Sequence, residues 1–132
     1  MRRTFSNDYT ADWPCVARAV KEAAGWKCVR CDHPHDPGRG YTLTVDHWDG
    51  DKANNAWFNL LPLCQRCHLS VQGRVIAERP WVWEHSAWFR PYVAGHYAKR
   101  YLGRSLSREE VELDLDYYLA LEREAVLGGG AR

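Results

Sequence analysis

Two short cysteine pairs organise this chain: Cys28-Val29-Arg30-Cys31 and Cys64-Gln65-Arg66-Cys67-His68. Two cysteines separated by two residues can present their thiolates to one tetrahedral zinc ion from a tight turn. The two pairs together therefore predict a closed structural zinc site with four cysteine ligands. The alternative is that the four cysteines are small buried apolar residues, as free cysteines commonly are.

The chain has 132 residues, of which 45% are hydrophobic and 27% charged. This length and composition predict one soluble domain over residues 1–132. No apolar run approaches the roughly 18 residues that cross a bilayer, and the N-terminus lacks the apolar stretch of a secretory signal. We therefore expect a cytoplasmic protein with no membrane partner, in which cysteine pairs at this spacing favour metal over disulfides. The fifth cysteine, Cys15, is expected to be buried on a helix.

Helix and strand signals in the first half of the chain predict an α+β fold. A helix is expected over residues 13–24, with Asp12 as its N-cap and Gly25 at its end. Residues 41–45 are mostly β-branched or aromatic, which predicts a strand. Turn-forming residues follow before apolar residues resume at Trp57, so the chain is expected to turn back as a hairpin.

The second cysteine pair opens a predicted helix that runs to about residue 76, because no proline interrupts it before Pro80. His68 then lies in the first turns of this helix. A histidine that directly follows a ligand of a rigid zinc site is well placed to bind a second ligand. Asp46-His47, at the end of the predicted strand, supplies the partner.

Residues 79–127 form a predicted helical extension. Seven aromatic residues lie between Trp81 and Tyr101, which suits a hydrophobic core between helices or, with the interleaved arginines, a base-stacking platform. We expect the core. Gly103 ends the first helix of the extension, and a capping box over residues 107–110 begins a last helix through Val126.

Charge is unevenly distributed along the chain, although the net charge is only +1. Residues 60–104 carry seven Lys/Arg against two Asp/Glu, and residues 105–132 carry three against seven. The basic segment is either a surface that faces phosphates or a solvated face neutralised by the acidic tail. On the first interpretation, Arg66 and Arg74 are the candidate DNA-binding residues.

Four polar residues lie at defined spacings around the second cysteine pair. Val45-Asp46-His47 is followed after eleven residues by Asn59, and Asn59 is followed after eight more by His68. The run from Asn59 to Cys64 reads Asn-Leu-Leu-Pro-Leu-Cys, which is similar to the Asn-Leu-x-x-Leu-Cys signature of one nuclease family. Together these motifs resemble an HNH endonuclease with a four-cysteine zinc site, over about residues 26–75.

The resemblance implies a ββα-metal finger over about residues 26–76, in which a hairpin and a helix clasp one divalent ion. The four-cysteine zinc knuckles pin the two ends of the finger together, and an N-terminal helix and the helical extension flank it. Between Cys31 and Cys64 lie 32 residues, more than a zinc ribbon usually has. An inserted hairpin explains that length.

Hydrolysis of a phosphodiester bond needs a nucleophilic water, stabilisation of charge on the pentacovalent phosphorus and help for the leaving oxygen. An imidazole can accept a proton at neutral pH, so His47 is the candidate general base. Asp46 and His68 are the candidate ligands of the catalytic divalent ion. Adjacent side chains on a strand point to opposite faces, so we expect an irregular strand end that lets Asp46 and His47 share one site.

The family resemblance further implies that Asn59 is catalytic in a supporting sense: it ties the hairpin loop and orients His47 through a hydrogen bond. It implies DNA as the substrate, with 5′-phosphate and 3′-hydroxyl products. One carboxylate, one imidazole and several waters suit magnesium, manganese, nickel or zinc, and we expect magnesium in cells. The small size suggests a phage or mobile-element setting, with the C-terminal helices as a candidate contact for a homodimer or for a phage or host protein.

Each candidate residue also has a simpler interpretation. Asp46 can be a turn former, His47 a solvated side chain, His68 a helix-surface residue and Asn59 an N-cap. His33 and His35 are expected to lie in a floppy loop, although either could replace a zinc thiolate.

The alternative function is a non-catalytic zinc-finger module that binds nucleic acid or a protein partner through residues 79–126. Such a module needs the cysteines. It does not need the quartet of Asp46, His47, Asn59 and His68.

Overall fold

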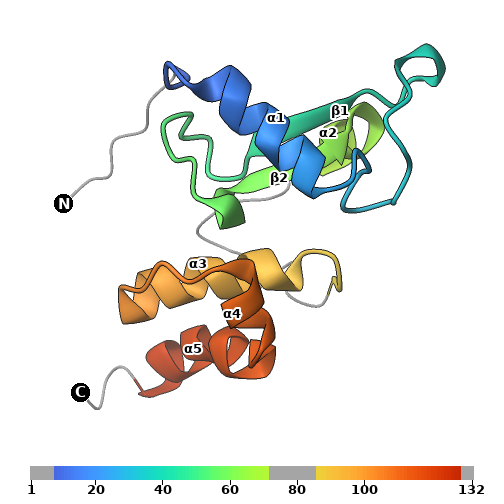
Figure 1. Cartoon of the computed structure of the whole chain (residues 1–132). Coiled ribbons are helices and arrows are strands. Elements are labelled where there is room, and N and C mark those ends of the chain that lie inside the picture. Colours follow the sequence, from blue (N-terminus) through green and yellow to red (C-terminus); the bar gives the residue numbers. More distant parts are fainter. Residues whose placement is uncertain (1–7, 72–85, 129–132) are drawn as a thin grey trace. The chain divides into compact units, whose positions relative to one another are not determined.

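The computed structural model describes residues 8–71 and 86–128, and the chain divides into two compact units (Figure 1). Unit 1 is Met1–Arg79 and unit 2 is Pro80–Arg132. The division falls where the sequence places the junction between the cysteine-pair core and the helical extension. That residues 1–132 form one domain stays a prediction. Among the described residues, no helix combines the length and the apolar character needed to cross a membrane.

Unit 1 is a small α+β unit built around a two-stranded antiparallel sheet. Its elements in chain order are α1 (Trp13–Ala23), the 3₁₀ turn η1 (Pro37–Arg39), β1 (Leu43–His47), the 3₁₀ turn η2 (Trp57–Asn59), β2 (Leu60–Cys64) and α2 (Gln65–Val71). Helices α1 and α2 both contact the hairpin (Figure 1). The coarse α+β prediction is thus confirmed, with an N-terminal helix before the hairpin and a helix directly after it.

Strand β2 is buried along its whole length and forms the centre of unit 1. Its three leucines are nearly fully buried, as are Leu43 of β1 and Phe58 of η2. Pro62 lies in the middle of β2, opposite Val45. The Pro62 carbonyl accepts a hydrogen bond from the Val29 N–H, so this residue turns its backbone away from β1 and its missing N–H removes no bond of the ladder.

Strand β1 begins and ends two residues later than the sequence predicts. Tyr41 is not part of it, because its backbone N–H and carbonyl both bond to Asp36 and close a separate loop. The ladder instead pairs Leu43 with Cys64 and continues without interruption to His47 and Leu60. Asp46 and His47 therefore lie inside a regular strand, and the expected irregular strand end is wrong.

Helix α1 covers the predicted segment, and Gly25 follows it in the left-handed conformation at φ 66°. A stripe of half-buried residues at helical spacing, including Val16 and Val20, faces inward. Cys15 lies off that stripe and is exposed. The expectation that Cys15 is buried is therefore wrong, because the helix buries only one face.

The helix predicted after the second cysteine pair is present as α2, and its described part ends at Val71. Three residues named in the sequence argument, Arg74, Pro80 and Trp81, lie outside the described residues, as does the predicted end of this helix near residue 76.

Unit 2 consists of α3 (Arg90–Leu102), α4 (Arg108–Glu112) and α5 (Leu115–Gly128) among the described residues. Helix α3 packs against both others, and its buried face includes Tyr92, Val93 and Tyr97. For these described aromatic residues, the predicted role in a hydrophobic core is confirmed. Gly103 ends α3 in the left-handed conformation, at φ 67°.

The single last helix predicted from Ser107 to Val126 is instead two helices. The last turn of α4 tightens into i→i+3 bonds, in which the N–H groups of Leu113 and Asp114 reach the carbonyls of Glu110 and Val111. The Asp114 carbonyl then accepts from the first turn of α5. Aspartate favours helix N-termini, so this residue restarts the chain in a new helix.

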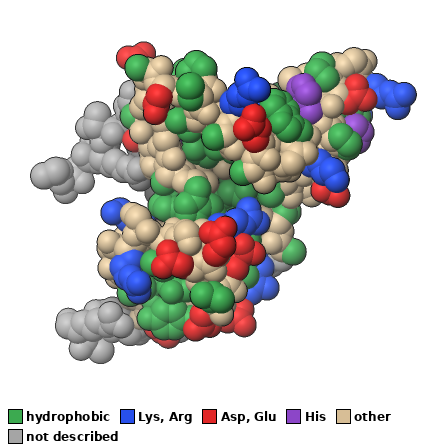
Figure 2. All heavy atoms as spheres, viewed as in Figure 1, with side chains coloured by type: hydrophobic (Ala, Val, Ile, Leu, Met, Phe, Trp, Pro, Cys, Tyr) green, Lys and Arg blue, Asp and Glu red, His purple; other side chains and the backbone are tan. Residues whose placement is uncertain are grey.

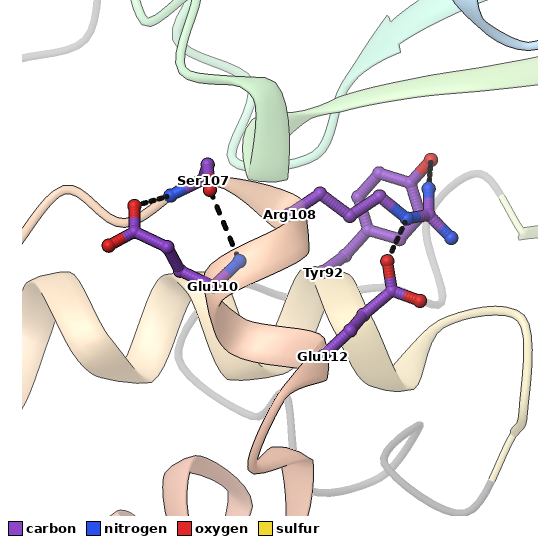
Figure 3. Close-up of polar contacts among 5 residues, drawn as sticks. All are labelled: Tyr92, Ser107, Arg108, Glu110 and Glu112. Atoms are coloured by element: carbon purple, nitrogen blue, oxygen red, sulfur yellow. Dashed lines mark hydrogen bonds and ion pairs between the residues drawn. The ribbon is translucent and has the colours of Figure 1, made fainter.

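Unit 2 carries acidic and basic side chains interspersed on the face that Figure 2 shows. Arg90, from the basic segment of the sequence, pairs with Asp116 of the acidic tail at 2.8 Å. Arg108 lies over the ring of Tyr92 and bonds to Glu112 (Figure 3). For Arg90 the interpretation as a face neutralised by the tail is therefore the better one.

The capping box at the start of α4 is a local stability element that can be tested. The Ser107 side chain accepts from the Glu110 N–H, and the Glu110 carboxylate accepts from the Ser107 N–H (Figure 3). We expect Ser107→Ala to reduce the free energy of unfolding by about 1 kcal/mol, measured by urea denaturation. Ser105→Ala, at a nearby exposed position, is the matched control. Equal stability of the two variants would show that the box contributes nothing.

Candidate metal centre

The four paired cysteines come together in unit 1. The Sγ atoms of Cys28, Cys31, Cys64 and Cys67 all lie within 4.8 Å of one another. The Sγ atoms of Cys31 and Cys64 are 3.8 Å apart, which is the edge of a tetrahedron whose centre lies about 2.3 Å from each sulfur. The predicted four-cysteine metal site is thus present in the fold, and its donor set and spacing suit zinc.

The two cysteine turns have the same local geometry. In each turn the backbone N–H of the second cysteine points at the Sγ of the first, at 3.5 Å for Cys31 to Cys28 and 3.4 Å for Cys67 to Cys64. The first turn is tied to the sheet by the Val29–Pro62 bond described above. The second turn is the junction of β2 with α2. One metal ion here would connect a loop to the strand–helix junction.

The thiols experience opposing influences in the absence of metal. Burial raises the pKa of Cys67 from its ordinary value of 9.0 to about 12, although the Arg30 guanidinium, 3.5 Å from its Sγ, acts in the other direction. Burial also raises the pKa of Cys31. For Cys28, burial acts upward, but backbone N–H groups favour the thiolate more and the pKa is lowered. Zinc binding must therefore displace protons, and affinity should fall as the pH falls.

We expect the purified protein to hold about one zinc ion per chain, and Cys64→Ser to lose the ion and unfold unit 1. A structural zinc supplies roughly 10 kcal/mol or more of folding free energy. Metal analysis and circular dichroism measure the two effects. Cys15→Ser is the matched control, because Cys15 is exposed and outside the cluster. A zinc-free Cys64→Ser protein with parental thermal stability would contradict the structural site.

A second pair of potential ligands lies next to the cysteine cluster. The Oδ2 atom of Asp46 and the Nδ1 atom of His68 are 3.7 Å apart, with both side chains 29% exposed. This distance is too long for a hydrogen bond. The His68 Nδ1 atom itself is buried and has no hydrogen-bond partner among the described residues. A buried polar atom without a partner is unfavourable unless something else binds it.

These two residues fit a divalent ion. Two atoms that each bind one ion at about 2.1 Å lie roughly 3 to 3.8 Å apart. Burial raises the pKa of Asp46 above its ordinary value, and the nearby charges of His68 and His47 lower it only in part. A bound cation would oppose the effect of burial and favour the carboxylate.

His47 lies on the other face of β1, as the strand's pleat requires. Its ring packs against Trp13 of α1, with centroids 4.6 Å apart, and against Tyr9 at 5.8 Å. The side chain is only 8% exposed. Its Nε2 atom is 2.9 Å from the Oδ1 atom of Asn55. The interpretation of His47 as a merely solvated side chain does not describe this environment.

Asn59 is buried at the base of the loop that joins the two strands. Its side chain accepts from the Asp49 N–H and donates to Asp49 Oδ1 and to the Asn54 carbonyl. Asn59 therefore ties the hairpin loop, as the resemblance implies, and β2 rather than a helix follows it. The hydrogen bond expected from Asn59 to His47 is made by Asn55 instead.

Arg66 is engaged on the surface of unit 1. Its guanidinium lies over the ring of Tyr41 at 4.3 Å and donates to the Arg39 carbonyl.

The two histidines after the first cysteine pair contact their neighbours. The ring of Tyr41 stacks on His33, with centroids 3.4 Å apart, and His35 Nδ1 accepts from the Leu43 N–H. Both histidines thus contact neighbouring residues, and neither belongs to the four-cysteine cluster.

Sequence reasoning missed the residues that surround His47. In the sequence, Asn55 belongs to the turn-forming residues before Trp57, and nothing in the pattern around Tyr9, Thr10 and Trp13 connects them to His47. The signal available was weak: an aromatic–Thr–x–Asp–aromatic segment before a helix also fits simple capping. Arg30, inside the first cysteine turn, was likewise missed.

Comparison with protein-family models, with curated proteins and with solved structures finds no match for this chain.

Proposed function

We propose that this protein is a metal-dependent endonuclease of the HNH kind, which hydrolyses DNA phosphodiester bonds and is held together by a four-cysteine zinc site. The observation that carries the proposal is the Asp46–His68 pair. A carboxylate faces a buried imidazole nitrogen at a distance that suits two ligands of one ion and does not suit a hydrogen bond. The four-cysteine cluster supports only the zinc part of the proposal.

Asp46 and His68 would hold a divalent ion, with magnesium the expected ion in cells. Such an ion supplies charge stabilisation at the phosphorus and lowers the pKa of water. His47 would remove the proton from the attacking water. Asn59, by closing the loop after β1, would keep His47 and the strand end in place. Cleavage would leave 5′-phosphate and 3′-hydroxyl ends.

A second candidate function is a zinc module that binds nucleic acid or a protein without catalysis. The burial of His47 favours it, because a ring that is 8% exposed and covered by Tyr9 and Trp13 is poorly open to substrate. The pleat of β1 also directs His47 and Asp46 to opposite faces. The buried His68 Nδ1 atom has no hydrogen-bond partner among the residues that the structure describes. This favours the nuclease, because a binding module has no need of such an atom.

A plasmid-nicking assay separates the two candidates. We expect the zinc-loaded protein to convert supercoiled plasmid to nicked or linear DNA with added magnesium or manganese, and to lose this activity in EDTA. The structural zinc content is measured in parallel. Binding of DNA without metal-dependent cleavage would favour the non-catalytic module. Linear product would require two copies or two successive nicks, and unit 2 is the proposed contact for a second copy.

Three variants should fail in different ways if the assigned roles hold. His47→Ala should keep divalent-ion affinity and lose cleavage by a factor on the order of 100 to 10,000. Asp46→Ala and His68→Ala should lose both. All three should keep the structural zinc, because none of these residues belongs to the cysteine cluster. Manganese titration followed by electron paramagnetic resonance measures affinity. Parental cleavage by His47→Ala would remove it as the base.

Arg66 and Arg74 remain the proposed DNA contacts, and the salt dependence of binding tests them. Each lost phosphate contact should reduce the slope of log affinity against log salt by about 0.9. We therefore expect Arg66→Ala and Arg74→Ala each to flatten the slope measured by fluorescence anisotropy. Arg18→Ala is the control, because Arg18 is an exposed arginine of α1 that pairs with Glu22 and is not a proposed DNA contact. An unchanged slope with lower thermal stability for Arg66→Ala would make its contact with Tyr41 purely structural.

A further inference from the structure

We infer that Thr10 and Asn55 are positioning residues that hold His47 as the tautomer protonated on Nε2, which leaves Nδ1 as the atom able to accept a proton. The consequence for catalysis rests on the proposed nuclease function. The assignment of the tautomer does not, because it follows from hydrogen bonds within unit 1.

A continuous chain of side-chain hydrogen bonds leads from the N-terminal segment to His47. The Thr10 hydroxyl donates to Asp12 Oδ1 at 2.6 Å. The Asn55 amide nitrogen donates to Thr10 Oγ1 at 2.9 Å. The Asn55 carbonyl oxygen lies 2.9 Å from His47 Nε2. The chain thus joins a residue before α1, the loop between the strands and the end of β1.

The direction of this chain is fixed by its far end. An ionised carboxylate can only accept hydrogen bonds, so the Thr10 hydroxyl must use its one hydrogen to donate to Asp12. Toward Asn55, Thr10 can then only accept, and the Asn55 atom facing it must be the amide NH₂ group. The Asn55 carbonyl oxygen therefore faces His47. A carbonyl oxygen has no proton to give, so His47 Nε2 must carry one.

The position of the ring supports the same assignment. Trp13 and Tyr9 pack against His47, and the ring belongs to the last residue of a regular strand. Exchanging the two ring nitrogens would require the ring to turn between these aromatic side chains and to break the Asn55 bond. Packing and hydrogen bonding therefore select one orientation together.

The tautomer sets the geometry of proton removal. In the proposed reaction an O–H bond of the attacking water breaks, its proton forms a new N–H bond at His47 Nδ1, and the oxygen keeps the electron pair for phosphorus. The ring then carries a positive charge, and its Nε2–H group still donates to Asn55. A hydrogen bond from a charged donor is stronger than one from a neutral donor, so Asn55 would stabilise the charged ring.

Nitrogen-15 NMR of the zinc-loaded protein tests the tautomer without any cleavage assay. At a pH where the ring is neutral, we expect His47 in the parent to show one tautomer with a slowly exchanging proton on Nε2. Thr10→Val removes the hydroxyl and frees the Asn55 amide to turn, so the single tautomer and the slow proton should be lost. Thr10→Ser keeps the hydroxyl and should retain both. A parent His47 protonated on Nδ1, or a Thr10→Val spectrum identical to the parental one, would overturn the inference.

Asn55 itself provides the second arm. Asn55→Leu should lose the slow Nε2 proton, whereas Asn55→Asp keeps an acceptor oxygen and should retain it. If the protein cleaves DNA, Asn55→Leu should lower kcat by a factor on the order of 10 to 100 with KM for DNA unchanged, and Asn55→Asp should restore most of it. If the parent protein shows the fixed tautomer but does not cleave DNA, the proposed nuclease function is refuted and the role of Thr10 and Asn55 in fixing the tautomer still holds. If Asn55→Leu cleaves DNA with the parental kcat and shows the parental tautomer, the role of Asn55 in fixing the tautomer is refuted and the nuclease function still holds.

Discussion

The four sulfur atoms of the cysteine cluster are the constraint on which unit 1 depends. A two-stranded sheet with short helices has little apolar surface to bury, and hairpins of this size are marginal in water. The cluster fixes the first cysteine turn to the junction of β2 with α2, while the Val29–Pro62 hydrogen bond brings the same turn to the outer edge of β2. We therefore expect the fold of unit 1 to be coupled to occupation of the cluster by a metal ion.

The same junction determines what the candidate site can do. His68 directly follows Cys67, so its position on α2 is set by a residue of the metal cluster. Asp46 lies opposite Leu61 of β2, one of the strands that the cluster holds. The 3.7 Å separation of their side chains is thus defined by backbone that cannot move independently of the cysteines. If the proposed divalent ion binds Asp46 and His68, this arrangement would give it a preorganised pair of ligands and would link its binding to the integrity of the cysteine cluster.

Local chemistry made part of this structure predictable from the sequence. The cysteine spacing, the left-handed glycines after α1 and α3 and the Ser107–Glu110 capping box all act over a few residues, and all are present. The two-residue shift of β1 depends on the backbone bonds between Asp36 and Tyr41, which connect loop residues without any periodic pattern. The split between α4 and α5 depends on one aspartate in a continuous helical pattern. The environment of His47 required a contact over 45 residues of sequence, from Asn55 to Thr10, and no local signal encodes it.

The burial of His47 bears on both candidate functions. In a binding module, His47 would only attach α1 to the hairpin, through its packing on Tyr9 and Trp13 and its hydrogen bond to Asn55. An apolar side chain at position 47 would make this attachment at a lower free-energy cost, because a buried imidazole must find partners for two nitrogens. The hydrogen-bond chain through Thr10 and Asn55 satisfies only the Nε2 atom of His47 and leaves its Nδ1 atom to another partner. A residue that keeps one ring nitrogen satisfied by a directed chain and the other available has the arrangement expected of a proton acceptor. The physical cost of placing histidine there is therefore an argument for chemistry at His47, even though its ring lies across the strand from Asp46 and His68.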